Sequence, residues 1–150
     1  MYLNMLSKIV KKSFNELTNE ELYRIFDLRF KVFVMEQKIL YLDTDFKDQN
    51  SIHYMIFEDD QLVSYLRLVL PGFKYKEYAL SRIATDPDYR LKGLATELIR
   101  VSMNDVKGQP IRISGQAYLK DYYEKLGFKV VKGPYIEEDI LHYEMYHDNQ

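Results

Sequence analysis

The succession of strand, helix and strand over residues 78–116 most constrains how this chain can fold. Tyr78–Thr85 is an apolar run of strand length, and Pro87 marks a turn directly after it. The next segment, Gly93–Val106, carries apolar residues at the spacing of one helix face, namely Leu94, Leu98, Ile99 and Val101. Ile111–Gln116 then has the composition of another strand. Because a helix that connects two strands packs on a face of their sheet, the sequence predicts a layered α/β arrangement.

The N-terminal half predicts one long helix, three strands and one long loop. Thr18 and Glu21 have the spacing of a capping box, so we expect a helix that begins there and ends near Glu36. Its buried face is predicted from apolar residues that recur at helical intervals: Leu22, Ile25, Phe26, Leu28, Phe30, Val32 and Phe33. Residues 37–50 have no sustained period and predict a long loop. Strands are expected at Lys8–Phe14, Ile52–Phe57 and Leu62–Leu70.

The C-terminal part predicts one short helix and two more strands. We expect the helix over Ala117–Leu126, closed by Gly127, and the strands at Phe128–Val131 and Ile140–Met145. The order along the chain, with helices connecting strands in the second half, favours three layers around a mixed sheet. The chain has 150 residues, the size of one ordinary domain, so we expect a single domain over residues 1–150.

The composition disfavours several classes of function. There are 21 Lys and Arg against 23 Asp and Glu, and a net charge of -2 offers no general attraction to nucleic acid or to an anionic membrane. The chain has no cysteine, and its 3 histidines are scattered, which disfavours a metal site. No apolar run approaches the roughly 20 residues that span a bilayer, and the N-terminal segment lacks a signal peptide's apolar stretch. We therefore expect a cytoplasmic protein.

The segment Arg82–Thr96 is a strand end, a turn and a helix start, which is a suitable place to bind a phosphate group. A helix N-terminus exposes unpaired backbone N–H groups and a partial positive charge. Gly93 removes a side chain at this position, and Arg90 and Lys92 add positive charge beside it. The pattern is equally compatible with an ordinary helix start that carries two solvated bases. Neither a dinucleotide-binding glycine motif nor a P-loop is present.

A second motif closes the helix predicted after residue 116, and it reads Tyr-Glu-x-Leu-Gly-Phe over Tyr123–Phe128. The first motif reads Arg-x-x-Gly-x-Ala over Arg90–Ala95. Together the two motifs resemble the GNAT superfamily of acetyltransferases, whose acyl-CoA signature is Gln/Arg-x-x-Gly-x-Gly/Ala. The order of the predicted elements fits this superfamily over nearly the whole chain.

Other segments are similar to the ElaA-type branch of the superfamily, which has no firmly assigned substrate. They are Val32–Gln37, the pattern Tyr-x-Asp-x-Asp over Tyr41–Asp45, Gly115–Ala117 and His142. The chain also departs from common GNAT patterns at three positions. Many members have Gly in place of Ala95, Gly or a polar residue in place of Leu91, and Asn near the position of Gln116.

The resemblance implies a three-layer α/β/α fold with a mixed, mostly antiparallel sheet that is splayed between its fourth and fifth strands. It also implies acetyl-CoA as cosubstrate, with no metal. Backbone groups of Ile83, Ala84 and Thr85 would pair with the pantetheine arm as an added strand would. The pyrophosphate would lie on the helix start, with Tyr122 packed nearby, at Arg90, Leu91, Lys92, Gly93, Leu94, Ala95 and Thr96. A homodimer is compatible with the resemblance, since dimers are common for this fold.

The chemistry implied by the resemblance is direct transfer of an acetyl group to a primary amine of a small molecule, peptide or protein. A backbone N–H near Ile83 would stabilise the oxyanion. Tyr123 falls at the family position of the general acid, which protonates the departing CoA thiolate. A tyrosine on this helix can also be a structural residue packed under the sheet.

The general base is less constrained by the motifs. His53 and His142 lie in predicted strands, and histidine has the side chain best suited to proton transfer near neutral pH. Glu36, Asp43 and Asp45 come from the region that would roof the acceptor site. A histidine in a strand is often a structural residue with satisfied hydrogen bonds, so all five remain candidates.

The acceptor contacts and the activity itself leave alternatives open. Arg82 and Gln116 are candidate acceptor contacts, although Arg82 can instead pair with an acid at the edge of the core. The chain could also be a non-catalytic acyl-CoA-binding or sensor domain with the same fold, or a transferase of a longer acyl group. Release of CoA in the presence of amines separates an enzyme from a binding domain.

Overall fold

The computed structural model describes residues 9–150, and its strands form one 7-stranded sheet in the order β1-β2-β3-β4-β5-β7-β6. The strands are β1 (Ile9–Ser13), β2 (Ser51–Glu58), β3 (Gln61–Val69), β4 (Tyr78–Thr85), β5 (Ile111–Gln116), β6 (Lys129–Glu137) and β7 (Ile140–His147). The helices are α2 (Asn19–Arg29), α3 (Leu94–Asp105) and α4 (Lys120–Lys125). A π-helix continues α2 over Phe30–Glu36. Within the described range, none of the helices combines the length and apolar character needed to cross a membrane.

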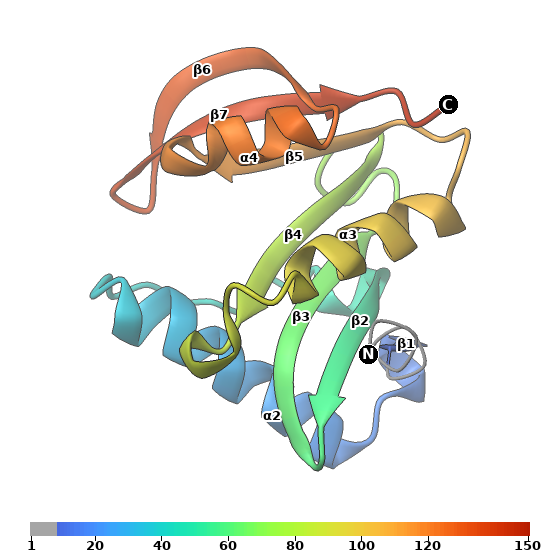
Figure 1. The fold of residues 1–150 in the computed structure, drawn as a ribbon, viewed down its shortest axis with the longest axis vertical. Helices are drawn as coiled ribbons and strands as arrows, with labels where there is room; N and C mark the ends of the chain where they lie inside the picture. The colour runs from blue at the N-terminus through green and yellow to red at the C-terminus, as the bar shows by residue number, and fades with distance from the viewer. Residues whose placement is uncertain (1–8) are drawn as a thin grey trace.

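Helices cover both faces of the sheet and so produce three layers (Figure 1). On one face, Leu98 and Ile99 of α3 and Tyr123 of α4 join the larger apolar core with side chains of the sheet. On the other face, Ile25 and Leu28 of α2 pack against side chains of β2, β3 and β4. The predicted three-layer α/β fold is therefore confirmed.

The sheet is antiparallel everywhere except between β4 and β5. These two strands pair in parallel only through Tyr78 with Ile111 and Ala79 with Arg112. Beyond these pairs they diverge, and Figure 1 shows β5 running with β7 while β4 stays with β3. The predicted splay is confirmed. Beyond Ala79, the edge of β4 that faces β5 has no partner strand among residues 9–150.

A β-bulge interrupts β4 along this open edge. Leu66 of β3 lies opposite both Arg82 and Ile83 of β4, between two regular pairs. Arg82 has a φ of 54°, in the left-handed region that is costly for a residue with a side chain. A bulge bends its strand and leaves backbone groups out of the ladder. The backbone of Arg82 and Ile83 is therefore not regularly paired with β3.

The predicted helix from Thr18 to Glu36 is present, but it changes its winding halfway. The capping box is formed, with Thr18 Oγ1 accepting from the Glu21 N–H at 3.1 Å and the Thr18 N–H donating to Glu21 Oε1 at 2.9 Å. After Arg29 the π-helix takes more residues per turn, so the α-helical spacing no longer identifies the inner face. Phe30, which was predicted to be buried, is 53% exposed.

Two predicted boundaries in the C-terminal part are corrected. The strand predicted at Phe128–Val131 runs over Lys129–Glu137. Because β6 lies at the sheet edge with mostly exposed side chains, its sequence has little hydrophobic alternation. The helix predicted at Ala117–Leu126 consists of a 3-10 turn, Ala117–Leu119, followed by α4. At the N-terminus, Lys8 of the first predicted strand lies outside the described residues.

Candidate active site

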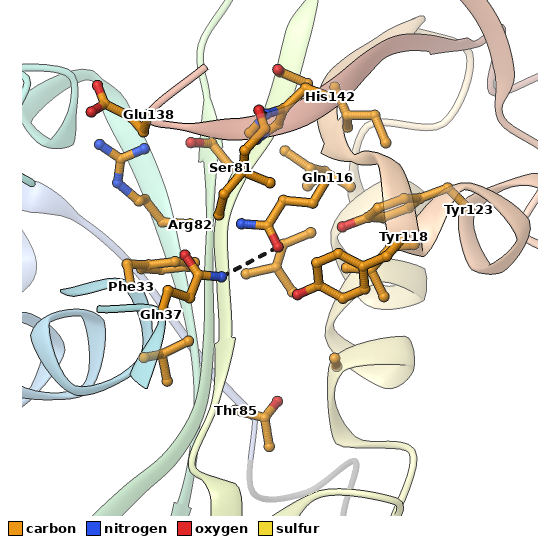
Figure 2. A pocket seen from close by; sticks show the side chains of 18 of the residues that line it. Phe33, Gln37, Ser81, Arg82, Thr85, Gln116, Tyr118, Tyr123, Glu138 and His142 are labelled. Atoms are coloured by element: carbon orange, nitrogen blue, oxygen red, sulfur yellow. Dashed lines mark hydrogen bonds between the residues drawn. The ribbon is translucent and has the colours of Figure 1, made fainter. Parts of the chain in front are cut away.

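A cleft with a volume of about 940 Å³ lies where β4 and β5 separate. Figure 2 shows side chains on its walls, which come from β4, β5, the π-helix, the following loop, the start of α3, α4 and the hairpin of β6 and β7. Most predicted site residues line it: Glu36, Arg82, Ile83, Thr85, Arg90, Leu91, Gly93, Leu94, Ala95, Thr96, Gln116, Tyr122, Tyr123 and His142. Asp45 lines it as well, whereas the predicted residues outside this lining are Asp43, His53, Ala84 and Lys92.

The start of α3 lies at the cleft with its unpaired backbone donors. Leu91 and Gly93 have φ values of 64° and 77°, so the chain enters the helix through left-handed residues. The Glu97 N–H donates to the Gly93 carbonyl at 3.1 Å, whereas the N–H groups of the first helical residues have no partner within the helix. An added Cβ at Gly93 would meet nothing within 4 Å. Its φ therefore favours glycine at this position, and the space beside Gly93 is open.

The two basic side chains near this helix start have other partners. Arg90 donates from both Nη atoms to the Glu36 carboxylate at 2.6 Å each, and from Nε to the Thr85 carbonyl at 3.1 Å. The Lys92 ammonium lies 5.2 Å from the centre of the Tyr89 ring. Arg90 thus ties the turn to the π-helix, and the groups at this end of the cleft without a partner in the helix are backbone N–H groups.

Tyr123 is held at the inner wall of the cleft by close packing. Its ring meets Phe128 edge-on, with centroids 6.0 Å apart, and a Cβ added at Gly115 would come within 3.1 Å of it. Burial raises the pKa of the Tyr123 phenol, which keeps it protonated at neutral pH. Figure 2 shows its hydroxyl directed into the cleft. The neighbouring Tyr122 shares a hydrogen bond of 2.6 Å with the Thr96 hydroxyl and so links α4 to α3.

His142 of β7 lines the same cleft with a defined arrangement of its ring. Its Nδ1 lies 2.7 Å from the carbonyl oxygen of Ile140. Because a carbonyl only accepts, Nδ1 carries the proton and Nε2 of the neutral ring keeps its lone pair. Nε2 is 3.7 Å from a carboxylate oxygen of Glu137, and the ring stacks on Tyr135. Nε2 can therefore accept a proton beside a carboxylate that would stabilise the resulting cation.

Two of the other base candidates are corrected by the structure. His53 is fully buried outside the cleft, with Nδ1 2.6 Å from the Tyr65 hydroxyl and Nε2 2.9 Å from the Asp48 carbonyl. Burial also lowers the pKa of His53, and neither ring nitrogen reaches the cleft. Glu36 lines the cleft, but the hydrogen bonds from Arg90 lower the pKa of its carboxyl and make it a weak base.

A charge network beside the cleft holds the loop 37–50 against the sheet. Asp48 accepts from Nη1 of both Arg29 and Arg67, at 2.6 Å and 2.9 Å, and both arginines are fully buried. Asp43 accepts from Nε of Arg29 at 2.8 Å and from Nε of Arg82 at 2.7 Å. The network is completed by Asp45, so that three arginines face three aspartates: Arg29, Arg67, Arg82, Asp43, Asp45 and Asp48.

This network explains the predicted residues Arg82, Asp43 and Asp45 structurally. Arg82 pairs with acids at the edge of the core, as the alternative interpretation held, and still lines the cleft. Burial alone would raise the pKa of Asp45, but its hydrogen bonds from Arg67 hold that pKa below the ordinary value. The hydrogen bonds of Asp43 to Arg29 and Arg82 leave it in a positioning role. Neither aspartate is retained as a base.

Several cleft residues were missed by the sequence analysis. Gln37 donates to the amide oxygen of Gln116 at 3.3 Å across the cleft, as the dashed line in Figure 2 marks. Ser114 donates to Glu137 at 2.7 Å, and Lys74 lines the cleft from the loop before β4. The period of a strand could have identified Ser114, which lies on the same face of β5 as Gln116. Lys74 and Glu137 come from segments without such a period.

The fold and the cleft together define a known class of protein. Residues 15–148 match the family described as acetyltransferase (GNAT) domain, and the chain belongs to this family. Among the residues that the structure describes, no group of three or more His, Cys, Asp or Glu is placed to hold a metal ion.

Related proteins and solved structures support the similarity to the ElaA-type branch. The chain is 35% identical to UPF0039 protein sll0451 of Synechocystis sp. over 137 residues, which are 88% of this chain and 89% of that protein. An acyl-CoA N-acyltransferase from Pseudomonas aeruginosa is 33% identical, with a TM-score of 0.88 over 93% of this chain and 97% of that one. Escherichia coli ElaA is 26% identical, with a TM-score of 0.84 over 93% and 98%. The predicted resemblance is confirmed.

Replacing Asp48 tests how much the charge network stabilises the fold. We expect Asp48→Asn to lower the free energy of unfolding by about 3–5 kcal/mol, because it leaves two buried guanidinium groups short of one negative charge. Asp60→Asn in the exposed hairpin turn is the matched control and should change it little. Urea unfolding near neutral pH measures both.

The same variant should also change the pH dependence of stability. The charge and hydrogen bonds of Arg29 and Arg67 outweigh burial and lower the pKa of Asp48. A lowered pKa stabilises the folded state above the ordinary carboxyl range near pH 4, and this stabilisation is lost as the pH falls through the folded-state pKa. Asp48→Asn should therefore narrow the stability difference between neutral and acidic pH. An equal loss at every pH would contradict this role.

Proposed function

We propose that the chain transfers an acetyl group from acetyl-CoA directly to a primary amine. The observation that carries the proposal is that the start of α3, the open edge of β4 and the hydroxyl of Tyr123 all border one cleft. Membership of the GNAT family supports the acyl-transfer chemistry.

In the proposed complex, backbone groups hold acetyl-CoA. The N–H groups from Leu91 to Thr96 bind the pyrophosphate, since a helix start supplies several donors and a partial positive charge. Ile83 and Thr85 line the cleft on the open edge of β4, and their backbone groups bind the pantetheine arm as an added strand. The side chain of Ala84 packs on the opposite face, against the cluster around α2, so only its backbone is available to the ligand.

The bulge supplies the group that stabilises the transition state. A backbone N–H near Ile83, released from the ladder, donates to the thioester oxygen as negative charge develops on it. The acceptor nitrogen forms the new bond to the carbonyl carbon, and the bond from that carbon to sulfur breaks. Asp43 holds Arg82 beside this point through an ion pair of 2.7 Å, and so positions the bulge.

Two side chains of the cleft move the protons. His142 takes a proton from the acceptor amine at Nε2, and Glu137 stabilises the positive charge of the ring. Tyr123 gives its phenolic proton to the sulfur of the departing CoA. Because the imidazole and the phenol lie on different walls of one cleft, one can act on the acceptor amine while the other acts on the CoA sulfur.

The first experiment measures calorimetric binding of acetyl-CoA and of longer acyl-CoAs, followed by CoA release with a panel of primary amines. We expect acetyl-CoA to bind and at least one amine to accelerate CoA release. Binding without release for every amine would favour the non-catalytic acyl-CoA-binding alternative. A chain that binds no CoA species would overturn the proposal altogether.

Removing the Tyr123 hydroxyl tests the general acid. Tyr123→Phe should lower kcat about 10²-fold or more, because the thiolate then leaves without a positioned proton donor. Calorimetric binding of acetyl-CoA should stay unchanged, since the ring still fills its place beside Phe128. Tyr146→Phe on β7, outside the cleft lining, is the matched control. An unchanged kcat in Tyr123→Phe would remove Tyr123 from the mechanism.

Replacing His142 tests the general base. His142→Gln should lower kcat/KM and remove the rise of kcat/KM on the acidic side of the pH profile, because the titrating base is gone. The control is His147→Gln at the far end of β7. If the acidic limb of the profile persists in His142→Gln, another group or a water chain is the base.

A further inference from the structure

The charged side chains of the cleft differ in whether they have partners within the chain. Glu36 pairs with Arg90, Asp45 with Arg67, and Arg82 with Asp43. Glu137 accepts a hydrogen bond from Ser114 and faces His142. Over residues 9–150, the two half-buried cleft cations that form no ion pair within 4.0 Å are Lys47 and Lys74.

Lys74 is positioned by a tight turn in the loop that precedes β4. The Gly72 N–H donates to the Tyr75 carbonyl at 2.7 Å, and the Phe73 N–H donates to the Leu70 carbonyl at 3.4 Å. The Lys74 ammonium lies 5.6 Å from the centre of the Tyr75 ring. A lysine in such a turn reaches the cleft from a fixed backbone, unlike a lysine at a chain end.

Lys74 lies beside the charge network without forming an ion pair with it in the described chain. Three arginines and three aspartates of the charge network neutralise one another, so Lys74 adds a charge that this network does not balance. Burial lowers the pKa of Lys74, and the guanidinium groups of Arg82 and Arg67 lower it further, against the opposing charges of Glu137 and Asp45. The lowered pKa means that the charged form of Lys74 is disfavoured in the folded chain, and an anion placed beside Lys74 would stabilise that charged form.

We propose that the amine acceptor carries a carboxylate, and that Lys74 pairs with this carboxylate while the amine lies toward His142 and Glu137. The acceptor class is therefore an amino acid or a small compound of the same kind, and Arg82, whose charge acts on Lys74, adds positive charge on the carboxylate side. This inference rests on the proposed acetyl transfer, which it deepens by naming the acceptor class.

The division of charge in the cleft favours this class over a simple polyamine. Glu137 lies near Nε2 of His142, where a reacting amine is bound and deprotonated. Lys74 would repel a second cationic group beside it. Glu138 also lines the cleft and forms no ion pair in the described chain. Its side chain is exposed on the turn between β6 and β7 and is solvated. A negative group on the acceptor would give Lys74 the ion-pair partner that it lacks in the described chain.

The kinetic test compares amino acids with their carboxamides as acceptors, using CoA release from acetyl-CoA. We expect kcat/KM to be at least about tenfold higher for the preferred amino acid than for its carboxamide. Lys74→Met should remove this preference, because it should lower kcat/KM for the amino acid, mainly by raising KM, and leave kcat/KM for the carboxamide unchanged. Lys74→Arg should keep most of it, and Lys76→Met, an exposed neighbour, should keep all of it.

A binding measurement makes the test independent of turnover. N-acetyl amino acids, which have the structure of the products, are titrated into the CoA-saturated protein beside their carboxamides. We expect at least one acid to bind about tenfold more tightly than its carboxamide, and Lys74→Met to abolish the difference. No preference for the acid, or a preference that survives in Lys74→Met, would overturn the inference. Absence of CoA release with every amine would instead count against the proposed transfer, and the titration would still decide the role of Lys74.

Discussion

The separation of β4 and β5 after only two residue pairs is the constraint on which the rest of the site depends. A parallel pair that continued for its full length would close the sheet and leave no space between its halves. Because the strands diverge, the backbone edge of β4 is open, and α3 and α4 pack beside the gap and not across it (Figure 1). The cleft is thus a consequence of sheet topology, and the side chains on its walls adapt it to chemistry.

The charge network stabilises one wall of this cleft at a considerable cost in desolvation. Buried arginines are unfavourable unless their partners are close and their hydrogen bonds are satisfied. Arg29 and Arg67 meet this condition through Asp43, Asp45 and Asp48, which come from the loop 37–50 and from the short 3-10 turn at its end. The network therefore fixes a loop that has little apolar surface of its own. It also reaches Arg82 in the bulge of β4, so that the loop and the bulge are held by the same contacts.

Much of the fold and part of the site could be predicted from local sequence. β4 and β5 match their predicted ends because their apolar runs are bounded by turn residues. The helix start at Gly93 and the tyrosine at position 123 were identified through short motifs. The π-helix after Arg29 and the exposed strand β6 were not, because neither follows the period that usually identifies a buried face. His53 is predicted as a base candidate from its residue type alone. The sequence around it does not reveal that both ring nitrogens have hydrogen-bond partners in the core.

The sequence by itself determined the order of the elements, the glycine at the start of α3 and the family to which its motifs belong. These properties depend on residues close together in the chain, whose spacing carries the signal. Only the tertiary structure decided which polar groups face the cleft and which are occupied elsewhere. The pairing of Arg90 with Glu36, the approach of Glu137 to the His142 ring and the place of Lys74 beside Arg82 and Arg67 depend on the tertiary arrangement of the chain. Such contacts form through packing and hydrogen bonding across the fold, and no local pattern of residues specifies them.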